Sequence, residues 1–176
     1  MEKVIIIGSG GAGKSTLAVK LGEVLGIKVY HLDALYWKPG WEMTPKDEWK
    51  LIVSGILKKD SWIMDGNFGS TLEMRAEAAD TIIFLDYSTL RCLYGIFKRR
   101  IMYHGKTRPD MNEGCPEKLD WEFIKWVATY KRKKAPDIQA RMERLREQGK
   151  EIYHFTSPGE TARFIEKLSN NRRVSA

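Results

Sequence analysis

Hydrophobic positions along the chain follow two patterns that alternate. Short apolar runs rich in β-branched residues predict buried strands, and apolar residues spaced three or four positions apart predict helices. Strands are predicted for 3–8, 28–33, 61–66, 81–86 and 150–157. Helices are predicted for 17–25, 44–60, 70–78, 88–104, 119–133, 136–148 and 158–168.

This alternation predicts an α/β fold in which helices cover both faces of a parallel sheet. The stretch 105–117 contains glycines and prolines without apolar periodicity, so we expect a loop or flap there. A chain of 176 residues suits one domain. We assign residues 1–170 to that domain and expect 171–176 to be a frayed tail. In such folds, ligands bind at the carboxyl ends of the strands.

The strongest motif, GSGGAGKS, follows the first predicted strand and opens the first helix. It matches the Walker A pattern, in which backbone N–H groups and a helix N-terminus surround phosphate oxygens. Lys14 would bind the β- and γ-phosphates, and the Ser15 hydroxyl would bind Mg²⁺. The sequence therefore predicts ATP and Mg²⁺ as cofactors. The predicted nucleotide-binding residues are Gly8, Ser9, Gly10, Gly11, Ala12, Gly13, Lys14, Ser15 and Thr16.

A P-loop magnesium site usually needs an acid at the end of a neighbouring strand. Asp65 and Asp86 each end an apolar run, and the residues alone leave both open. Asp65 could instead be a turn residue in DGN, and Asp86 could belong to the start of the next helix.

Together these motifs resemble the adenylate-kinase-like branch of the P-loop kinases. A narrower resemblance, to the DNA topology modulation (FlaR-related) proteins, runs from the start to about residue 168. It rests on HLDALYWKPGW, WIMDGNFGSTLEMR, ADTIIFLDYS and GCPE. The resemblance implies a three-layer P-loop NTPase fold with strand order 2-3-1-4-5, a lid segment at about 100–135, and Asp65 as the magnesium acid.

The sequence departs from adenylate kinases at the positions that contact the nucleoside monophosphate. It has DGNFG where they have DGFPR, and HLDALYW where they have a threonine-glycine-aspartate signature. The resemblance therefore does not extend to AMP as the acceptor.

An acceptor pocket is predicted around Asp33, which follows the second apolar run. A carboxylate at this edge can orient a hydroxyl group and take its proton. The neighbouring rings could wall the pocket, or they could simply pack the loop. Arg75 is either an acceptor-binding or a solvated helix residue. The predicted pocket residues are Asp33, Tyr36, Trp37, Trp41, Asn67 and Arg75.

Phosphoryl transfer also requires cations opposite the P-loop. Arg99 and Arg100 close the helix before the flap, and Arg108 lies in the flap, so we count all three as candidate catalytic residues. Cations at a helix C-terminus are also favoured by its dipole, which is the simpler explanation for Arg99 and Arg100.

Bulk properties limit the partners. The formal net charge of +7 favours anionic partners such as nucleotides or nucleic acid. The two cysteines lack metal-ligand spacing, which suits the cytoplasm, and no apolar run is long enough to span a membrane. The main prediction is a kinase acting on a small molecule, nucleoside or nucleotide. The alternatives are a DNA-associated regulatory protein that binds ATP and an ATPase without an acceptor.

Overall fold

A computed structural model describes residues 1–174 of the chain. Its main sheet has five parallel strands in the order β2-β5-β1-β6-β7. The strands are β1 (Lys3–Gly8), β2 (Val29–His31), β5 (Trp62–Asp65), β6 (Thr81–Leu85) and β7 (Glu151–Phe155). Numbered within this sheet alone, the order is 2-3-1-4-5, which confirms the prediction.

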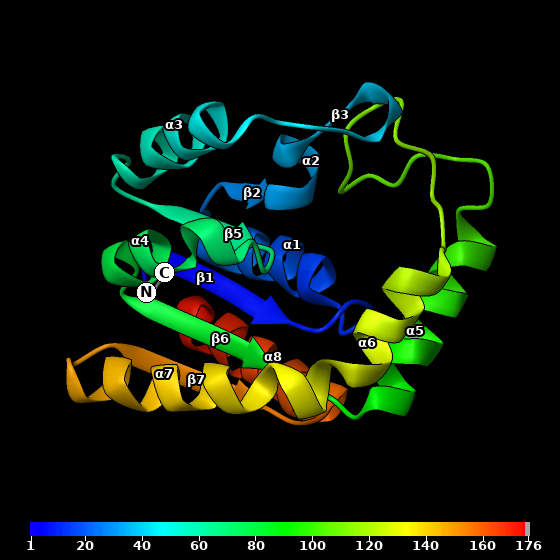
Figure 1. Ribbon diagram of the computed structural model, residues 1–176. Coiled ribbons are helices and arrows are strands. Elements are labelled where there is room, and N and C mark those ends of the chain that lie inside the picture. Colours follow the sequence, from blue (N-terminus) through cyan, green and yellow to red (C-terminus); the bar gives the residue numbers. More distant parts are fainter. Residues whose placement is uncertain (175–176) are drawn as a thin grey trace.

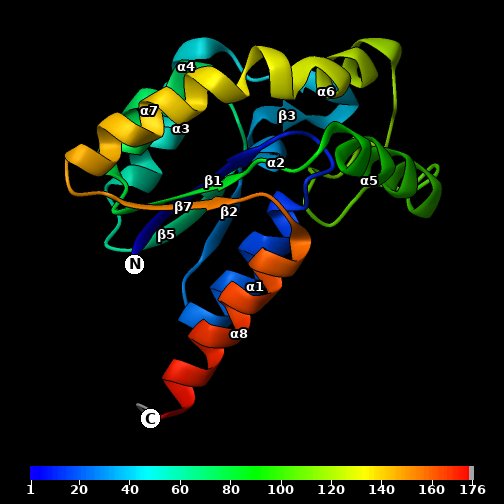
Figure 2. The same cartoon turned by 90° about the horizontal axis from the view of Figure 1, so that it is seen from below.

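Helices cover both faces of the sheet (Figures 1 and 2). The helices are α1 (Lys14–Leu25), α2 (Leu32–Tyr36), α3 (Lys46–Leu57), α4 (Gly69–Ala78), α5 (Thr89–Met102), α6 (Trp121–Lys133), α7 (Ala135–Glu147) and α8 (Pro158–Val174). Figure 2 shows α1 and α8 on one face, and α3, α4 and α7 on the other. Successive side chains of β1 point to opposite faces of the sheet. Ile5 and Ile7 pack in one core cluster, and Val4 and Ile6 pack in the other. A strand buried on both faces explains the continuous apolar run of β1.

The segment after β2 differs from the prediction. The strand ends at His31, and Asp33 lies in the first turn of α2 rather than at the end of a strand. A small antiparallel hairpin follows, formed by β3 (Trp37–Lys38) and β4 (Glu42–Met43) around the turn Pro39–Trp41. The apolar pattern did not separate strand from helix here, because both elements are shorter than two periods of their pattern.

The last helix extends into the segment that we expect to be a frayed tail. Helix α8 continues to Val174, so residues 171–174 of that segment are helical. The Arg172 side chain donates a hydrogen bond to the carbonyl oxygen of Val24 at 2.7 Å, which ties α8 to α1. Residues 175–176 lie outside the described part of the chain.

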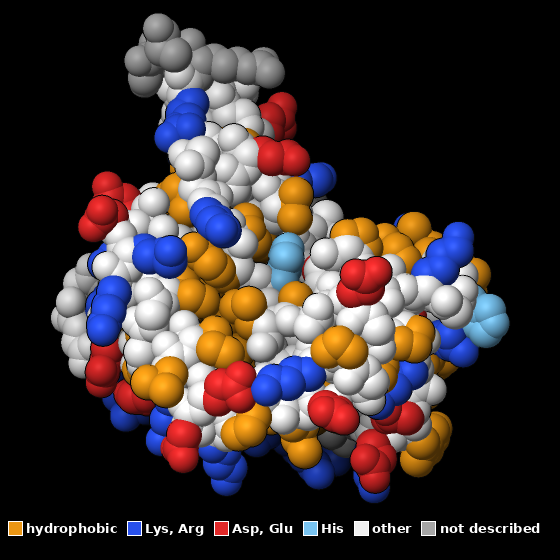
Figure 3. Space-filling view, turned by 90° about the horizontal axis from the view of Figure 1, so that it is seen from above, with side chains coloured by type: hydrophobic (Ala, Val, Ile, Leu, Met, Phe, Trp, Pro, Cys, Tyr) orange, Lys and Arg blue, Asp and Glu red, His pale blue; other side chains and the backbone are white. Residues whose placement is uncertain are grey.

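Helix α5 has two different faces. Its inner side carries the buried residues Cys92 and Ile96 against the P-loop, whereas Leu90 and Ile101 are 80% and 79% exposed. Hydrophobic side chains accordingly lie at the surface, beside lysines and arginines, at the right-hand end of Figure 3, where α5 and the 103–120 loop lie in Figure 1. Among the described residues, no helix has the length and apolar character needed to cross a membrane.

Candidate active site

The P-loop has the backbone shape that its glycines allow. Gly11 has φ +76°, and a Cβ atom there would lie 2.2 Å from the carbonyl oxygen of Cys92. Gly13 has φ +86° and precedes α1, which begins at Lys14. The Lys14 ammonium donates a hydrogen bond to the carbonyl oxygen of Ser9 at 3.0 Å, so the lysine folds back over the loop. Burial lowers the pKa of Lys14, while the carboxylates of Asp33 and Asp65 oppose that shift.

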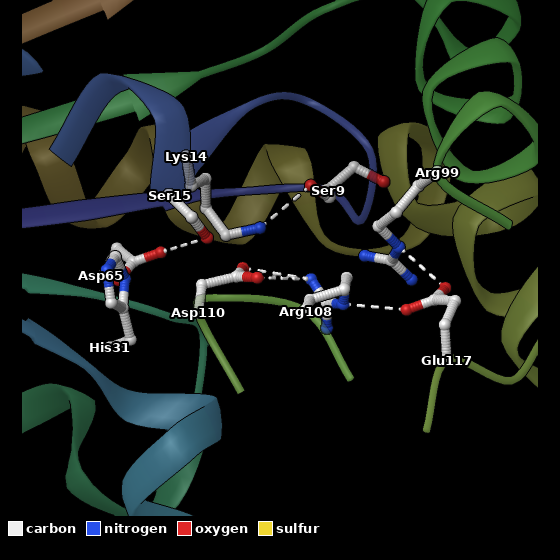
Figure 4. Close-up of polar contacts among 9 residues, drawn as sticks. All are labelled: Ser9, Lys14, Ser15, His31, Asp65, Arg99, Arg108, Asp110 and Glu117. Atoms are coloured by element: carbon white, nitrogen blue, oxygen red, sulfur yellow. Dashed lines mark hydrogen bonds and ion pairs between the residues drawn. The ribbon is translucent and has the colours of Figure 1, made fainter. Parts of the chain in front are cut away.

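A chain of hydrogen bonds joins the P-loop to the ends of β5 and β2. Ser15 donates from Oγ to Oδ2 of Asp65 at 2.7 Å, and Oδ1 of Asp65 lies 2.6 Å from Nδ1 of His31 (Figure 4). Burial alone would lower the pKa of His31, but the hydrogen bond and the charge of Asp65 raise it above its ordinary value. The pairing of β1 with β5 brings Asp65 opposite Ile6, two residues before the P-loop begins.

This arrangement fits a magnesium ion. A hydroxyl and a carboxylate are the oxygen ligands that P-loop proteins offer to Mg²⁺, and phosphate and water supply the remaining ligands. The Ser15 hydroxyl already donates a hydrogen bond to the Asp65 carboxylate, so both oxygen groups lie at one place. They would hold the ion, which would neutralise charge on the β- and γ-phosphates.

Asp86, the other candidate acid, has different neighbours. Its carboxylate contacts Lys131, Gln139 and His154, each at 3.2 Å, and it is 6% exposed. It does not line the cavity that contains the P-loop. The geometry therefore favours Asp65 as the acid beside Ser15.

A cavity of about 1080 Å³ contains both sides of the predicted site. Lys14, Ser15, Asp33 and Asp65 line it, together with both predicted tryptophans, Trp37 and Trp41. Asp33 is accessible through this cavity but closely surrounded by protein. Loss of hydration raises its pKa, and Lys14 opposes the shift. Among the described residues, the Asp33 carboxylate has neither a hydrogen-bond partner nor an ion-pair partner.

Two predicted pocket residues do not line the cavity. Tyr36 instead packs against Trp49 and Phe68, with ring centroids 5.2 and 4.7 Å away. Arg75 is fully buried, and it donates hydrogen bonds at 3.1 Å to the carbonyl oxygens of residues 66, 67 and 68. Arg75 is enclosed by its own packing and is not free to meet a ligand, whereas Tyr36 is partly buried and supports Trp37 from behind, with ring centroids 5.1 Å apart.

Asn67 lines the cavity but also has a structural role. Its side chain pairs with the backbone of Gly8, accepting from the N–H at 3.1 Å and donating to the carbonyl oxygen at 2.8 Å. These two hydrogen bonds fix the start of the P-loop to the segment that follows β5.

Two of the three predicted cations, Arg99 and Arg108, converge on one carboxylate, that of Glu117. Nε of Arg99 lies 2.8 Å from one oxygen of Glu117, and Nε of Arg108 lies 2.7 Å from the other. Arg108 also contacts Asp110, at 2.9 Å. Figure 4 shows the guanidinium groups of Arg99 and Arg108 beside each other between Lys14 and Glu117. Arg100 points elsewhere, donating to the backbone oxygen of Glu117 at 3.0 Å, and it does not line the cavity.

The 103–120 loop is hydrogen-bonded to the β3–β4 hairpin. Gly40 donates from its backbone to the carbonyl oxygen of Gly114 at 3.0 Å, and Nε1 of Trp41 donates to that of Pro116 at 3.2 Å. Trp41 has φ +65°, a left-handed conformation that is rare outside glycine. These bonds hold Trp41 at the wall of the cavity and join it to the loop that carries Arg108.

Sequence reasoning missed three residues of this site, namely His31, Asp110 and Glu117. His31 lies two residues before Asp33 in the predicted strand 28–33, near its carboxyl end, so its position could have marked it. Nothing local distinguished Glu117 from the other acids of its loop, because its burial depends on contacts with α5.

Comparison with known proteins finds similarity to solved structures only. No family model matches the chain, and no curated protein matches it. The shikimate kinase of Bacteroides thetaiotaomicron has a TM-score of 0.55 and 14% identity, covering 97% of each chain. That of Acinetobacter baumannii, solved in complex with shikimate, has a TM-score of 0.56 and 12% identity, covering 99% of this chain and 94% of that one.

The chain has a shikimate-kinase-like P-loop fold. At these identities the likeness concerns the fold alone. The relation to DNA topology modulation proteins stays a prediction, because neither of the two shikimate kinase structures bears on it.

Proposed function

We propose that this protein is an ATP-dependent kinase that phosphorylates a hydroxyl group of a small molecule. The observation that carries the proposal is the placement of Asp33 in the same cavity as Lys14 and the Ser15–Asp65 pair. The cavity thus offers a phosphate site and an unpaired carboxylate facing one space. An ATPase needs no such carboxylate on the acceptor side.

Each residue then has a defined part in the transfer. The P-loop amides and Lys14 bind the phosphates, and Ser15 and Asp65 hold Mg²⁺. Asp33 accepts the proton of the acceptor hydroxyl, and its raised pKa makes it a stronger base. The acceptor oxygen forms a bond to the γ-phosphorus while the bond to the β–γ bridging oxygen breaks. ADP leaves with that electron pair, and the proton passes from Asp33 to solvent.

Arg99 and Arg108 would face the charge that develops on the transferred group. Glu117 holds both guanidinium groups by their Nε atoms, so an Nη group of each remains available. A preorganised cation at this position stabilises the transition state more than a flexible one. The predicted lid, at about 100–135, includes these residues, and its closure over ATP belongs to the proposal.

The test measures ADP release from Mg-ATP with a panel of hydroxyl compounds, and it identifies the phosphorylated product by mass spectrometry. Asp33→Asn should lower turnover about 10²- to 10⁴-fold and leave ATP binding intact. Lys14→Ala should weaken ATP binding itself, whereas Lys125→Ala, an exposed change on α6, should alter neither. ATP hydrolysis that no compound stimulates, and that Asp33→Asn leaves unchanged, would contradict the proposal.

A further inference from the structure

The distribution of charge in the cavity bears on the identity of the acceptor. A phosphomonoester or carboxylate acceptor needs a free cation on its own side of the site, because an unpaired buried anion is costly. Kinases that accept nucleoside monophosphates or acidic sugars must meet this requirement as well as the demands of ATP.

The arginines of this chain that lie near the cavity already have anionic or carbonyl partners. Arg99 and Arg108 share Glu117, and Arg108 also contacts Asp110. Arg75 is buried on three carbonyl oxygens outside the cavity. The two cavity arginines are thus balanced by two carboxylates, Glu117 and Asp110, and Figure 4 shows them on the same side of the site as Lys14.

The acceptor side has the opposite character. Asp33 offers an unpaired carboxylate. Loss of hydration raises its pKa, and the charges of Lys14 and Arg108 oppose that shift only in part. Trp37 and Trp41 lie beside it in the wall, with ring centroids 5.5 Å apart and planes at 65°. A further cation, Lys118, has its ammonium 4.4 Å from the centre of the Trp41 ring. This lysine is exposed, so its charge is largely screened by water.

From these observations we infer that the acceptor is an uncharged hydroxyl compound with a ring, such as a sugar or nucleoside. The tryptophans would cover the flat or apolar face of that ring, and Asp33 would bind a hydroxyl group. An anionic acceptor would place its charge near Asp33, where Lys14 would already bind the phosphates of ATP and Arg108 is already paired with Asp110 and Glu117. This inference rests on the proposed kinase function and specifies its substrate class.

The experiment compares compounds that differ only in charge. The pairs are nucleosides with their 5′-monophosphates, glucose with glucose 6-phosphate, and the methyl ester of shikimate with shikimate. Binding is followed by tryptophan fluorescence with a non-hydrolysable ATP analogue present, and turnover by mass spectrometry with ATP. The neutral member of at least one pair should have a kcat/KM at least about tenfold higher than its anionic partner. Comparing the sugar pair with the nucleoside pairs shows whether the acceptor is a sugar or a nucleoside.

Two variants sharpen the result. Trp41→Ala should raise the KM for the neutral compound, whereas Lys118→Gln should change kcat/KM less than about twofold. A preference for the anionic member that disappears in Lys118→Gln would overturn the inference while leaving the kinase function intact. Absence of fluorescence change with every compound would also overturn it. Failure of ATP binding and of all turnover would instead reject the kinase function.

Discussion

The Oγ atom of Ser15 lies 2.7 Å from a carboxylate oxygen of Asp65, although fifty positions separate the two residues in the sequence. The pairing of β1 with β5 produces this contact, because parallel neighbours end at the same edge of the sheet. It joins the hydroxyl of the Walker A motif to an acid and defines where the metal would sit.

A magnesium titration of activity should distinguish the roles of Asp65 and Asp86. Asp65→Asn removes the charge beside Ser15, so we expect the Mg²⁺ concentration for half-maximal activity to rise at least about tenfold. Asp86→Asn should leave that concentration unchanged and lower the unfolding free energy by about 1–3 kcal/mol, because it weakens contacts with Lys131 and His154. An effect of Asp86→Asn on magnesium dependence would contradict the assignment.

The pH profile of activity should report Asp33. A general base must be ionised, so kcat/KM should fall as the pH drops through the pKa of Asp33. Because burial raises that pKa, the acidic limb should lie above the ordinary aspartate value of about 4. A limb at the ordinary value, or an unchanged limb in Asp33→Asn, would count against this role.

The same shift predicts a change in stability. The unfolded carboxyl ionises more readily than the folded one, so folding loses stability as pH rises from the unfolded to the folded pKa. Asp33→Asn removes that loss, and its Tm at pH 7 should equal or exceed that of the parent. Near pH 3, where both forms are largely neutral, the difference should disappear. A Tm that falls at pH 7 would show that Asp33 supports the fold.

Gly95→Ala should disturb the P-loop through α5. A Cβ atom at Gly95 would lie 2.2 Å from the carbonyl oxygen of Gly11, so backbone must shift. We expect a loss of about 1–3 kcal/mol in unfolding free energy and weaker ATP binding by calorimetry. The matched control is Gly55→Ala in α3, which has open space around it and should stabilise the protein by about 0.5–1 kcal/mol. Unchanged ATP affinity in Gly95→Ala would show that the P-loop does not depend on this contact.

Arg75→Ala should destabilise the fold rather than the acceptor site. Burial lowers the pKa of Arg75 to about 10, and the side chain satisfies three carbonyl oxygens after β5. Leaving them unpaired should cost about 3 kcal/mol or more in urea unfolding. The exposed change Arg132→Ala should stay within about 0.5 kcal/mol. A stable Arg75→Ala variant with a raised acceptor KM would restore the pocket role.

Glu117→Gln should loosen the flap. The side chain of Glu117 is 1% exposed and holds Arg99 and Arg108 together, so its neutral variant weakens both ion pairs. Backbone amides in 103–120 should exchange hydrogen at least about tenfold faster. Glu113→Gln, an exposed change in the same loop, should leave exchange unchanged. Equal exchange in both variants would show that Glu117 does not organise the loop.

Much of this molecule could be predicted from local pattern. Apolar runs located the five strands of the main sheet, because buried parallel strands are apolar on both faces. The glycines and Lys14 of the P-loop act within one continuous turn, so a motif of eight residues describes them. The sheet order came from family resemblance and was confirmed.

Tertiary structure decided the rest, because those roles depend on partners distant in sequence. Tyr36 and Arg75 have the chemistry of pocket residues, but Arg75 is fully buried and Tyr36 packs its ring against Trp49 and Phe68. Asp65 and Asp86 end equivalent apolar runs, and only the order of the strands puts Asp65 beside Ser15. Arg99 at the end of α5 is likewise paired with Glu117 of the 103–120 loop, a partner that no local pattern indicates. Local sequence determines which groups are available, and packing determines which of them face the same space.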